Sequence, residues 1–130
     1  MSELQGRISE TIEHEPVVAF IKGTHEQVMC GNSDRALSAL RSVGASFAAV
    51  DILPDPAIRQ ELSALSNWPT IPQVFVGGEL VGGADIVEEL AASGGLAAKL
   101  DEKLGSDWRK GGEERTITLV ERQNPFRVVP

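Results

Sequence analysis

Two short apolar runs with a helical stripe between them constrain the fold of this chain most. The runs are VVAFI (17–21) and FAAVDI (47–52), and neither shows the polar alternation of a half-exposed strand. Apolar residues recur with helical spacing over 36–43, between the two runs. Strands joined through a helix run parallel, with a right-handed crossover. We therefore expect a βαβ unit and an α/β fold.

Helical patterns also flank and follow this unit. Apolar residues recur every four positions from Leu4 to Ile12, which predicts an N-terminal helix ended by Pro16. Ser2 stands where the first residue of a capping box belongs. The pair Asp55-Pro56 is typical of an N-cap followed by a first-turn proline, so a third helix is expected to begin there.

Two further strands complete the predicted sheet. QVFV (73–76) and ELVG (79–82) are separated by Gly77-Gly78, which favours a two-residue hairpin turn and antiparallel pairing. A fourth helix follows, with Ile86 and Leu90 expected to face inward and Val87 as a further candidate for the inner face. The resulting order predicts a four-stranded mixed sheet flanked by helices, an α/β arrangement.

The length and charge of the chain limit its organisation and partners. Its 130 residues suit one main domain, expected at 1–104, with a C-terminal extension at 105–130. A net charge of −7 argues against nucleic acid or an acidic membrane as a partner. A single cysteine, no signal-like start and no apolar run near the roughly 20 residues that span a bilayer together predict a cytoplasmic protein.

The C-terminal extension leaves two interpretations open. RTITLVER (115–122) alternates weakly between apolar and polar residues, as an added strand would. The alternative is a flexible tail. Phe126, in the sequence NPFRVVP, is a candidate for docking on the body of the domain.

Cys30 is the main candidate for a functional side chain. It falls where a polar loop that begins at Lys22 meets the second helix, at the carboxyl end of the first strand. A helix N-terminus favours the thiolate through its dipole and free N–H groups, and Lys22 adds positive charge. The alternative is a buried structural cysteine, against which its small and polar neighbours at 31–34 argue.

Two weaker motifs point to a ligand. In WPTIP (68–72), a cis Pro72 would expose the backbone of Thr70 and Ile71 to an extended ligand, whereas a trans proline would only begin an edge strand. In GGAD (82–85), glycines before a helix favour anion binding, and Asp85 is either an N-cap, a ligand acceptor or both. His14 and His25 lie on polar segments and are expected to be surface residues without a metal.

These segments together resemble a monothiol glutaredoxin of the CGFS type over about residues 4–104. The resemblance rests on FIKGTHEQVMCGNS, FAAVDILPDPAIRQEL and SNWPTIPQVFVGGELVGGADIVEEL, and on the spacing between them. It implies a thioredoxin-like fold that binds glutathione beside a reactive Cys30. The implied glutathione contacts are Lys22 and Arg59 for the glycine carboxylate, Thr70, Ile71 and cis Pro72 for the cysteinyl backbone, and Gly83, Ala84 and Asp85 for the γ-glutamyl end.

The resemblance also implies a [2Fe–2S] cluster with Cys30 as its metal ligand. Such a cluster takes four thiolates. Two chains would supply two and two glutathiones the others, so the cluster-bound form would be a homodimer. The implied role is to pass the cluster to apo iron–sulfur proteins, with a BolA-like protein as a further partner.

Two departures from the family pattern bear on that role. Asn32 replaces the phenylalanine of CGFS and gives less apolar cover, and the loop HEQVM (25–29) lacks the family's prolines, which would lower its entropy. An alternative function is a glutathione-dependent oxidoreductase, in which Cys30 attacks a mixed disulfide and a second glutathione resolves it. The long loop before Cys30 is typical of the carrier class and favours the carrier, with weak or no enzymatic activity.

Overall fold

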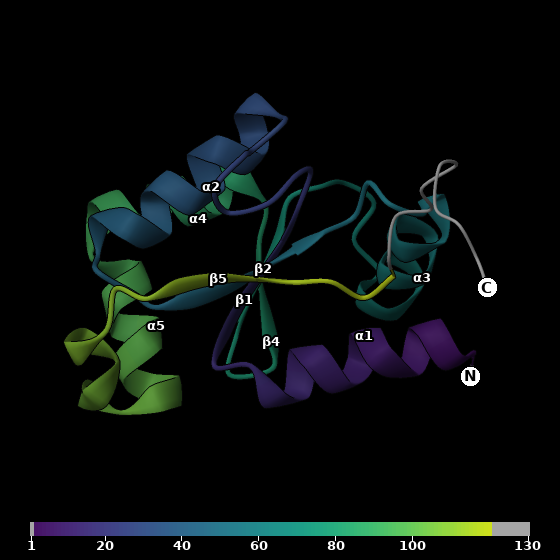
Figure 1. The fold of residues 1–130 in the computed structure, drawn as a ribbon. Coiled ribbons are helices and arrows are strands. Elements are labelled where there is room, and N and C mark those ends of the chain that lie inside the picture. The colour runs from purple at the N-terminus through teal and green to yellow at the C-terminus, as the bar shows by residue number, and fades with distance from the viewer. Residues whose placement is uncertain (1, 121–130) are drawn as a thin grey trace.

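A central strand between two layers of helices organises the molecule. The computed structural model describes residues 2–120, and Figure 1 shows its sheet with helices on both faces. The α/β thioredoxin-like class predicted from the sequence is confirmed. In chain order the elements are α1 (Glu3–His14), β1 (Val17–Ile21), α2 (Gly31–Ser42), β2 (Phe47–Asp51), α3 (Pro56–Ser66), β3 (Gln73–Val76), β4 (Glu79–Gly82), α4 (Ala84–Ser93), α5 (Gly95–Leu104), a 3-10 turn (Ser106–Lys110) and β5 (Glu114–Ile117).

The sheet has five strands, in the order β4-β3-β1-β2-β5. β1 pairs in parallel with β2, as the two apolar runs predict, and β3 pairs antiparallel with β4, as the hairpin turn predicts. β1 also pairs antiparallel with β3. A fifth strand is added to the four expected in the main domain, because β5 pairs in parallel with the outer edge of β2. The interpretation of the segment 115–122 as an added strand is thus confirmed for its first part. Without β5 that edge would present unpaired N–H and C=O groups. The interpretation that placed Phe126 on the body concerns residues outside the described range.

The two faces of the sheet carry separate hydrophobic cores. On one face, Leu37 and Leu40 of α2 pack with Val87 of α4 and with residues of α5. On the other face, Ile8 of α1 packs with Leu62 of α3. Figure 1 shows α1 and α3 on the side of the sheet opposite α2 and α4. Because β1 is covered on both sides, all five of its residues are buried, which explains its unbroken apolar sequence.

Local signals in the sequence mark the element boundaries correctly. The Ser2 hydroxyl accepts a hydrogen bond from the Gln5 N–H at 3.0 Å, so Ser2 caps α1. The Asp55 carboxylate accepts from the Ala57 N–H at 2.9 Å and caps α3. Gly77 and Gly78 have φ values of 57° and 82°, the left-handed conformation that a tight two-residue hairpin requires.

The expected inward face of α4 was wrong in one respect. Ile86 is 39% exposed, whereas its neighbour Val87 is fully buried. α4 begins at Ala84, directly after the hairpin, and Ile86 folds back over Gly82. A Cβ at Gly82 would lie only 2.8 Å from the Ile86 side chain, so the glycine makes room for it. Ile86 therefore lies at the rim of the cavity described below instead of in the core.

Candidate functional site

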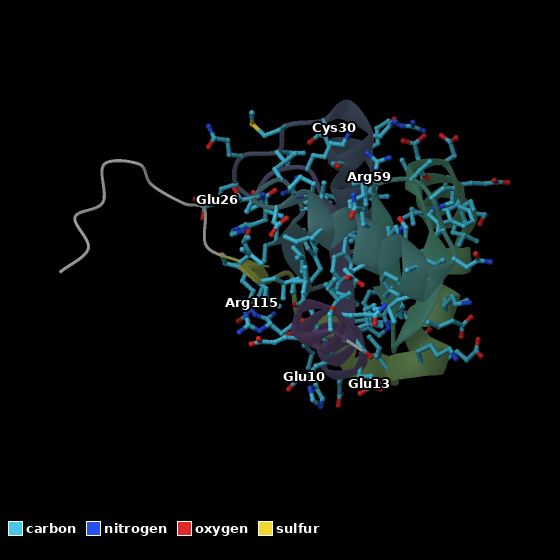
Figure 2. The ribbon with its side chains drawn as sticks, turned by 90° about the vertical axis from the view of Figure 1, so that its right-hand side faces the viewer. Glu10, Glu13, Glu26, Cys30, Arg59 and Arg115 are labelled. Carbon is cyan, nitrogen blue, oxygen red and sulfur yellow. The ribbon has the colours of Figure 1, made fainter. Side chains whose placement is uncertain are left out.

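Cys30 lies at the junction between the loop after β1 and helix α2. It is the N-cap residue of α2, with extended backbone angles, and its side chain makes no capping hydrogen bond. The loop closes on itself just before the cysteine, because the Met29 N–H donates to the Lys22 carbonyl at 2.8 Å. Figure 2 shows Cys30 at the end of the molecule opposite Glu10 and Glu13 of α1. The thiol is half-buried, so a ligand can reach it.

The start of α2 makes this thiol more acidic than an ordinary cysteine. The backbone N–H of Ser33 is the largest cause of a lowered Cys30 pKa, and the N–H of Asn32, the charge of Lys22 and the Ser33 hydroxyl act in the same direction. Partial burial opposes them without reversing the shift. The thiolate is the form that attacks disulfides and binds metals. The position therefore favours a chemically active cysteine over a structural one.

Ser33 fixes the geometry behind the thiol. The residue is fully buried, and its hydroxyl accepts a hydrogen bond from the Lys22 N–H at 3.1 Å. This bond joins the end of β1 to the first turn of α2. The serine thereby holds Lys22 and Cys30 near one another, although Cys30 is eight positions and Ser33 eleven positions from Lys22 in the chain.

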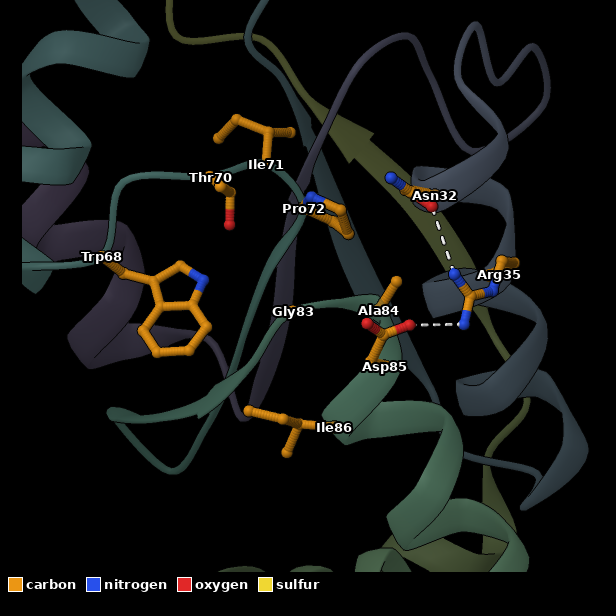
Figure 3. A pocket seen from close by; sticks show the side chains of 10 residues that line it. All are labelled: Asn32, Arg35, Trp68, Thr70, Ile71, Pro72, Gly83, Ala84, Asp85 and Ile86. Atoms are coloured by element: carbon orange, nitrogen blue, oxygen red, sulfur yellow. Dashed lines mark hydrogen bonds and ion pairs between the residues drawn. The ribbon is translucent and has the colours of Figure 1, made fainter.

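A cavity of about 440 Å³ lies beside the first turn of α2. Three segments far apart in the sequence meet around it: the start of α2, the loop before β3 and the start of α4 (Figure 3). Six of the residues proposed from the sequence line it together, namely Thr70, Ile71, Pro72, Gly83, Ala84 and Asp85. The remaining lining residues are Asn32, Arg35, Trp68 and Ile86.

The loop before β3 forms one wall of this cavity. The Ile71–Pro72 peptide bond is cis, as expected for a proline in this turn. Gln73 is fully buried beneath the loop, and its side-chain amide donates to the carbonyls of Trp68 at 2.8 Å and Thr70 at 3.2 Å. The loop is thus fixed from below, and its outer face borders the cavity.

The start of α4 forms the opposite wall. Gly83 is the N-cap, so the interpretation of Asp85 as an N-cap was wrong; Asp85 lies in the first turn. Its carboxylate instead accepts a hydrogen bond from Arg35 of α2 at 2.7 Å. Arg35 also donates to the Asn32 side chain at 3.2 Å, and Figure 3 shows this bond beside the one to Asp85. A further ion pair joins Arg35 to Glu88 at 2.9 Å. The carboxylates of Glu88 and then Asp85 raise the pKa of Arg35 further above its already high value.

Arg35 is the site residue that the sequence analysis missed. Fifty positions separate it from Asp85, and no local pattern links the two. The contact arises only because α2 and α4 pack side by side on one face of the sheet.

Three of the residues proposed from the sequence lie outside the lining of this cavity. Cys30 precedes the lining residue Asn32 by two positions, and the charge of Lys22 acts on the Cys30 thiol. Arg59 is an exposed residue of α3, and its guanidinium lies 3.5 Å from the Pro69 carbonyl of the cis-proline loop. The cavity thus joins the residues expected at the cysteinyl and γ-glutamyl parts of glutathione, and the two cations lie outside its lining.

A mixed sheet with a cysteine at the start of the first crossover helix and a cis-proline loop beside it defines a thioredoxin-like protein. The glutaredoxin family model matches residues 17–81. Monothiol glutaredoxin-S11 of Oryza sativa subsp. japonica is 46% identical over 99 residues, covering 76% of this chain and 20% of that protein. Glutaredoxin 4 of Escherichia coli (strain K12) is 44% identical over 102 residues, covering 78% and 89%.

Solved structures agree with the sequence comparison. The crystal structure of a buckwheat glutaredoxin–glutathione complex has a TM-score of 0.67 and 26% identity, and the match covers 76% of this chain and 88% of that one. The chain belongs to the glutaredoxin family, and its relatives include monothiol glutaredoxins. It spans only about a fifth of the rice protein but most of the Escherichia coli one.

Two further features of residues 2–120 concern metals and membranes. This part of the chain holds no group of three or more histidine, cysteine, aspartate or glutamate side chains that could together bind a metal ion. Within the same range, none of the helices combines the length and apolar character needed to span a membrane.

Proposed function

We propose that this protein is an iron–sulfur carrier that binds glutathione and shares a [2Fe–2S] cluster between two subunits through Cys30. The observation that carries the proposal is the position of Cys30. It is the only thiol of the chain, it is half-buried at a helix N-terminus that lowers its pKa, and it lies two residues before Asn32, which lines the cavity.

The chemistry of the cavity supports glutathione as the small thiol. Glutathione carries two carboxylates and one amine. The start of α4 at Gly83 and Ala84 offers backbone N–H groups for the γ-glutamyl carboxylate, and Asp85 offers an acceptor for the amine. The Asp85 carboxylate has room for both Arg35 and a ligand amine, because a carboxylate accepts several hydrogen bonds. The buckwheat relative was solved as a complex with glutathione.

The remaining parts of glutathione fit the flanking residues. The backbone of Thr70 and Ile71, before cis Pro72, would pair with the cysteinyl residue in the manner of an added strand. Lys22 and Arg59 would pair with the glycine carboxylate. This placement brings the glutathione sulfur toward Cys30, since the cysteinyl residue lies between the two ends of the tripeptide.

The donor set fits a cluster only if the cluster is shared. A [2Fe–2S] cluster takes four thiolates, and each chain supplies one. Two copies of Cys30 and two glutathione thiolates complete the set. When bound, such a cluster supplies an exchangeable iron and sulfide cargo. The residues of this chain contribute an acidic thiol and a bound thiol cofactor, both held near solvent.

The partners follow from the same arrangement. The cluster-bound form is a homodimer, and its clients are apo iron–sulfur proteins that supply stronger ligand sets. A BolA-like protein is a further proposed partner. Asn32 leaves the cluster less covered than the aromatic residue of CGFS would, so the cargo is expected to transfer readily.

The proposal is tested by anaerobic reconstitution with iron, sulfide and glutathione. The carrier predicts visible thiolate-to-iron charge-transfer absorption that depends on glutathione, together with dimerisation, and Cys30→Ser should abolish both. Rapid removal of glutathione from a mixed-disulfide substrate by a colourless monomer would instead support the oxidoreductase and contradict the carrier.

A further inference from the structure

The loop that carries Cys30 is tied to a strand outside the matched family range. The loop extends from Lys22 to Met29, and strand β5 (Glu114–Ile117) lies beyond residue 81, where the family match ends. β5 pairs with β2 from Phe47 to Val50. The parallel pairing brings the carboxyl ends of both strands to the edge of the sheet from which the loop also leaves.

The tip of the loop is bonded directly to β5. The backbone N–H of His25 donates to the Thr116 hydroxyl at 2.9 Å, and the His25 Nδ1 lies 2.7 Å from the same oxygen. The expectation that His25 is a plain surface residue was therefore wrong: its side chain is only 18% exposed. One hydroxyl group holds both the main chain and the side chain of a single loop residue.

A second connection supports the first. The Arg41 guanidinium pairs with the Glu114 carboxylate at 2.8 Å and also donates to the His25 carbonyl at 3.0 Å. Arg41 is in the last turn of α2, so it links that helix, β5 and the loop tip. Both the N–H and the C=O of His25 thus have partners outside the loop.

The base of the loop is fixed separately. The Gly23 N–H donates to the Asp51 carboxylate of β2 at 2.9 Å, and Gly23 forms an isolated bridge with Val28. The loop is therefore held at its base by β2 and at its tip by β5. Its sequence lacks the prolines that would otherwise restrict its conformations.

We propose that β5 is a positioning element for the thiol, in which Thr116 holds the Cys30 loop through His25. The anchored loop keeps its two ends, Lys22 and Met29–Cys30, in fixed relation to the first turn of α2. The hydrogen bond from the Met29 N–H to the Lys22 carbonyl closes the base of the loop, and the Thr116 anchor fixes the loop above it. Without the anchor the tip moves more freely, and this motion reaches the thiol through Met29. The proposal concerns the free thiol and does not depend on cluster binding.

The test compares Thr116→Val with Thr116→Ser in the full chain. Valine keeps the shape and strand preference of threonine but removes the hydroxyl, whereas serine keeps the hydroxyl. Thr11→Val is a matched control, because the Thr11 hydroxyl bonds only within α1, donating to the Arg7 carbonyl at 2.8 Å. The readouts are amide hydrogen exchange over residues 22–29 and the rate at which iodoacetamide alkylates Cys30 as a function of pH.

In Thr116→Val we expect about tenfold faster exchange of the loop amides, because the His25 N–H loses its acceptor. We also expect about threefold slower alkylation near neutral pH, because the thiol is held less firmly beside the first turn of α2. Thr116→Ser and Thr11→Val should match the parent protein in both. Unchanged exchange in Thr116→Val, faster exchange with unchanged alkylation, or a Thr116→Ser variant that behaves like the valine variant would each overturn the proposal.

Discussion

The Ser33 hydroxyl connects the end of β1 to the thiol, so its removal is a sharp test of the site geometry. In Ser33→Ala the Lys22 N–H loses its acceptor, which lies at 3.1 Å in a partly buried position. An unsatisfied donor of this kind costs about 1–2 kcal/mol, and alanine fits the vacated space without a clash. We therefore expect the free energy of unfolding to fall by that amount.

The same substitution should also change the pKa of the Cys30 thiol. The Ser33 hydroxyl is one of the groups that lower the Cys30 pKa, so its loss should raise that pKa. The backbone N–H of Ser33 is the larger cause and remains in the variant, so the pKa should stay below that of an ordinary cysteine. The pH profile of Cys30 alkylation should therefore move to higher pH, but not as far as the profile of an ordinary cysteine.

Urea unfolding and alkylation against pH measure the two effects. Ser42→Ala is the matched control, because the Ser42 hydroxyl donates to the Ala39 carbonyl at 2.7 Å within the same helix, remote from the thiol. It should leave the Cys30 profile unchanged. A Ser33→Ala variant with parental stability and a parental alkylation profile would refute this account of the first turn of α2.

Three further predictions follow from other contacts. Asp85→Asn should weaken glutathione binding, measured by calorimetry, about tenfold. Glu88→Gln is the control, because Glu88 is the other carboxylate partner of Arg35 but does not line the cavity, and it should change the binding little. Equal losses of affinity in the two variants would contradict the assignment of Asp85. Hydrogen bonds from two lysines of α5 lower the pKa of Glu79 to about 2. The contribution of Glu79 to stability is therefore fully present above its unfolded pKa and is lost as the pH falls through the folded value of about 2. Glu79→Gln should thus destabilise the protein at neutral pH and match the parent in strong acid. Gly23→Ala places a Cβ 2.4 Å from the Gln27 carbonyl at a φ of 107°, and should destabilise by about 1–3 kcal/mol in thermal unfolding; parental stability would contradict the loop geometry.

Most of the fold could be predicted because its signals are local. The unbroken apolar run of β1, the Ser2 and Asp55 caps and the Gly77-Gly78 turn each depend on a few neighbouring residues. The family resemblance implied the grouping of Thr70 to Pro72 with Gly83 to Asp85. The structure brings them together because one segment precedes β3 and the other follows β4, at the open end of the same hairpin.

The errors arose where the outcome depends on contacts between distant segments. β5 is a short strand of mixed polarity, so its weak alternation left both an added strand and a flexible tail open, and the free edge of β2 decides between them. The Arg35–Asp85 pair and the His25–Thr116 bonds join residues 50 and 91 positions apart. No periodicity or spacing within either partner indicates the other, so both required the packed structure.

The central claim is that Cys30 is one of four thiolate ligands of a shared cluster. Native mass spectrometry of the reconstituted protein tests it most directly, because the mass counts every component at once. The account predicts a species with two chains, one [2Fe–2S] cluster and two glutathiones, absent in Cys30→Ser. A cluster on a single chain, a dimer whose cluster lacks glutathione, or the same species in Cys30→Ser would contradict it.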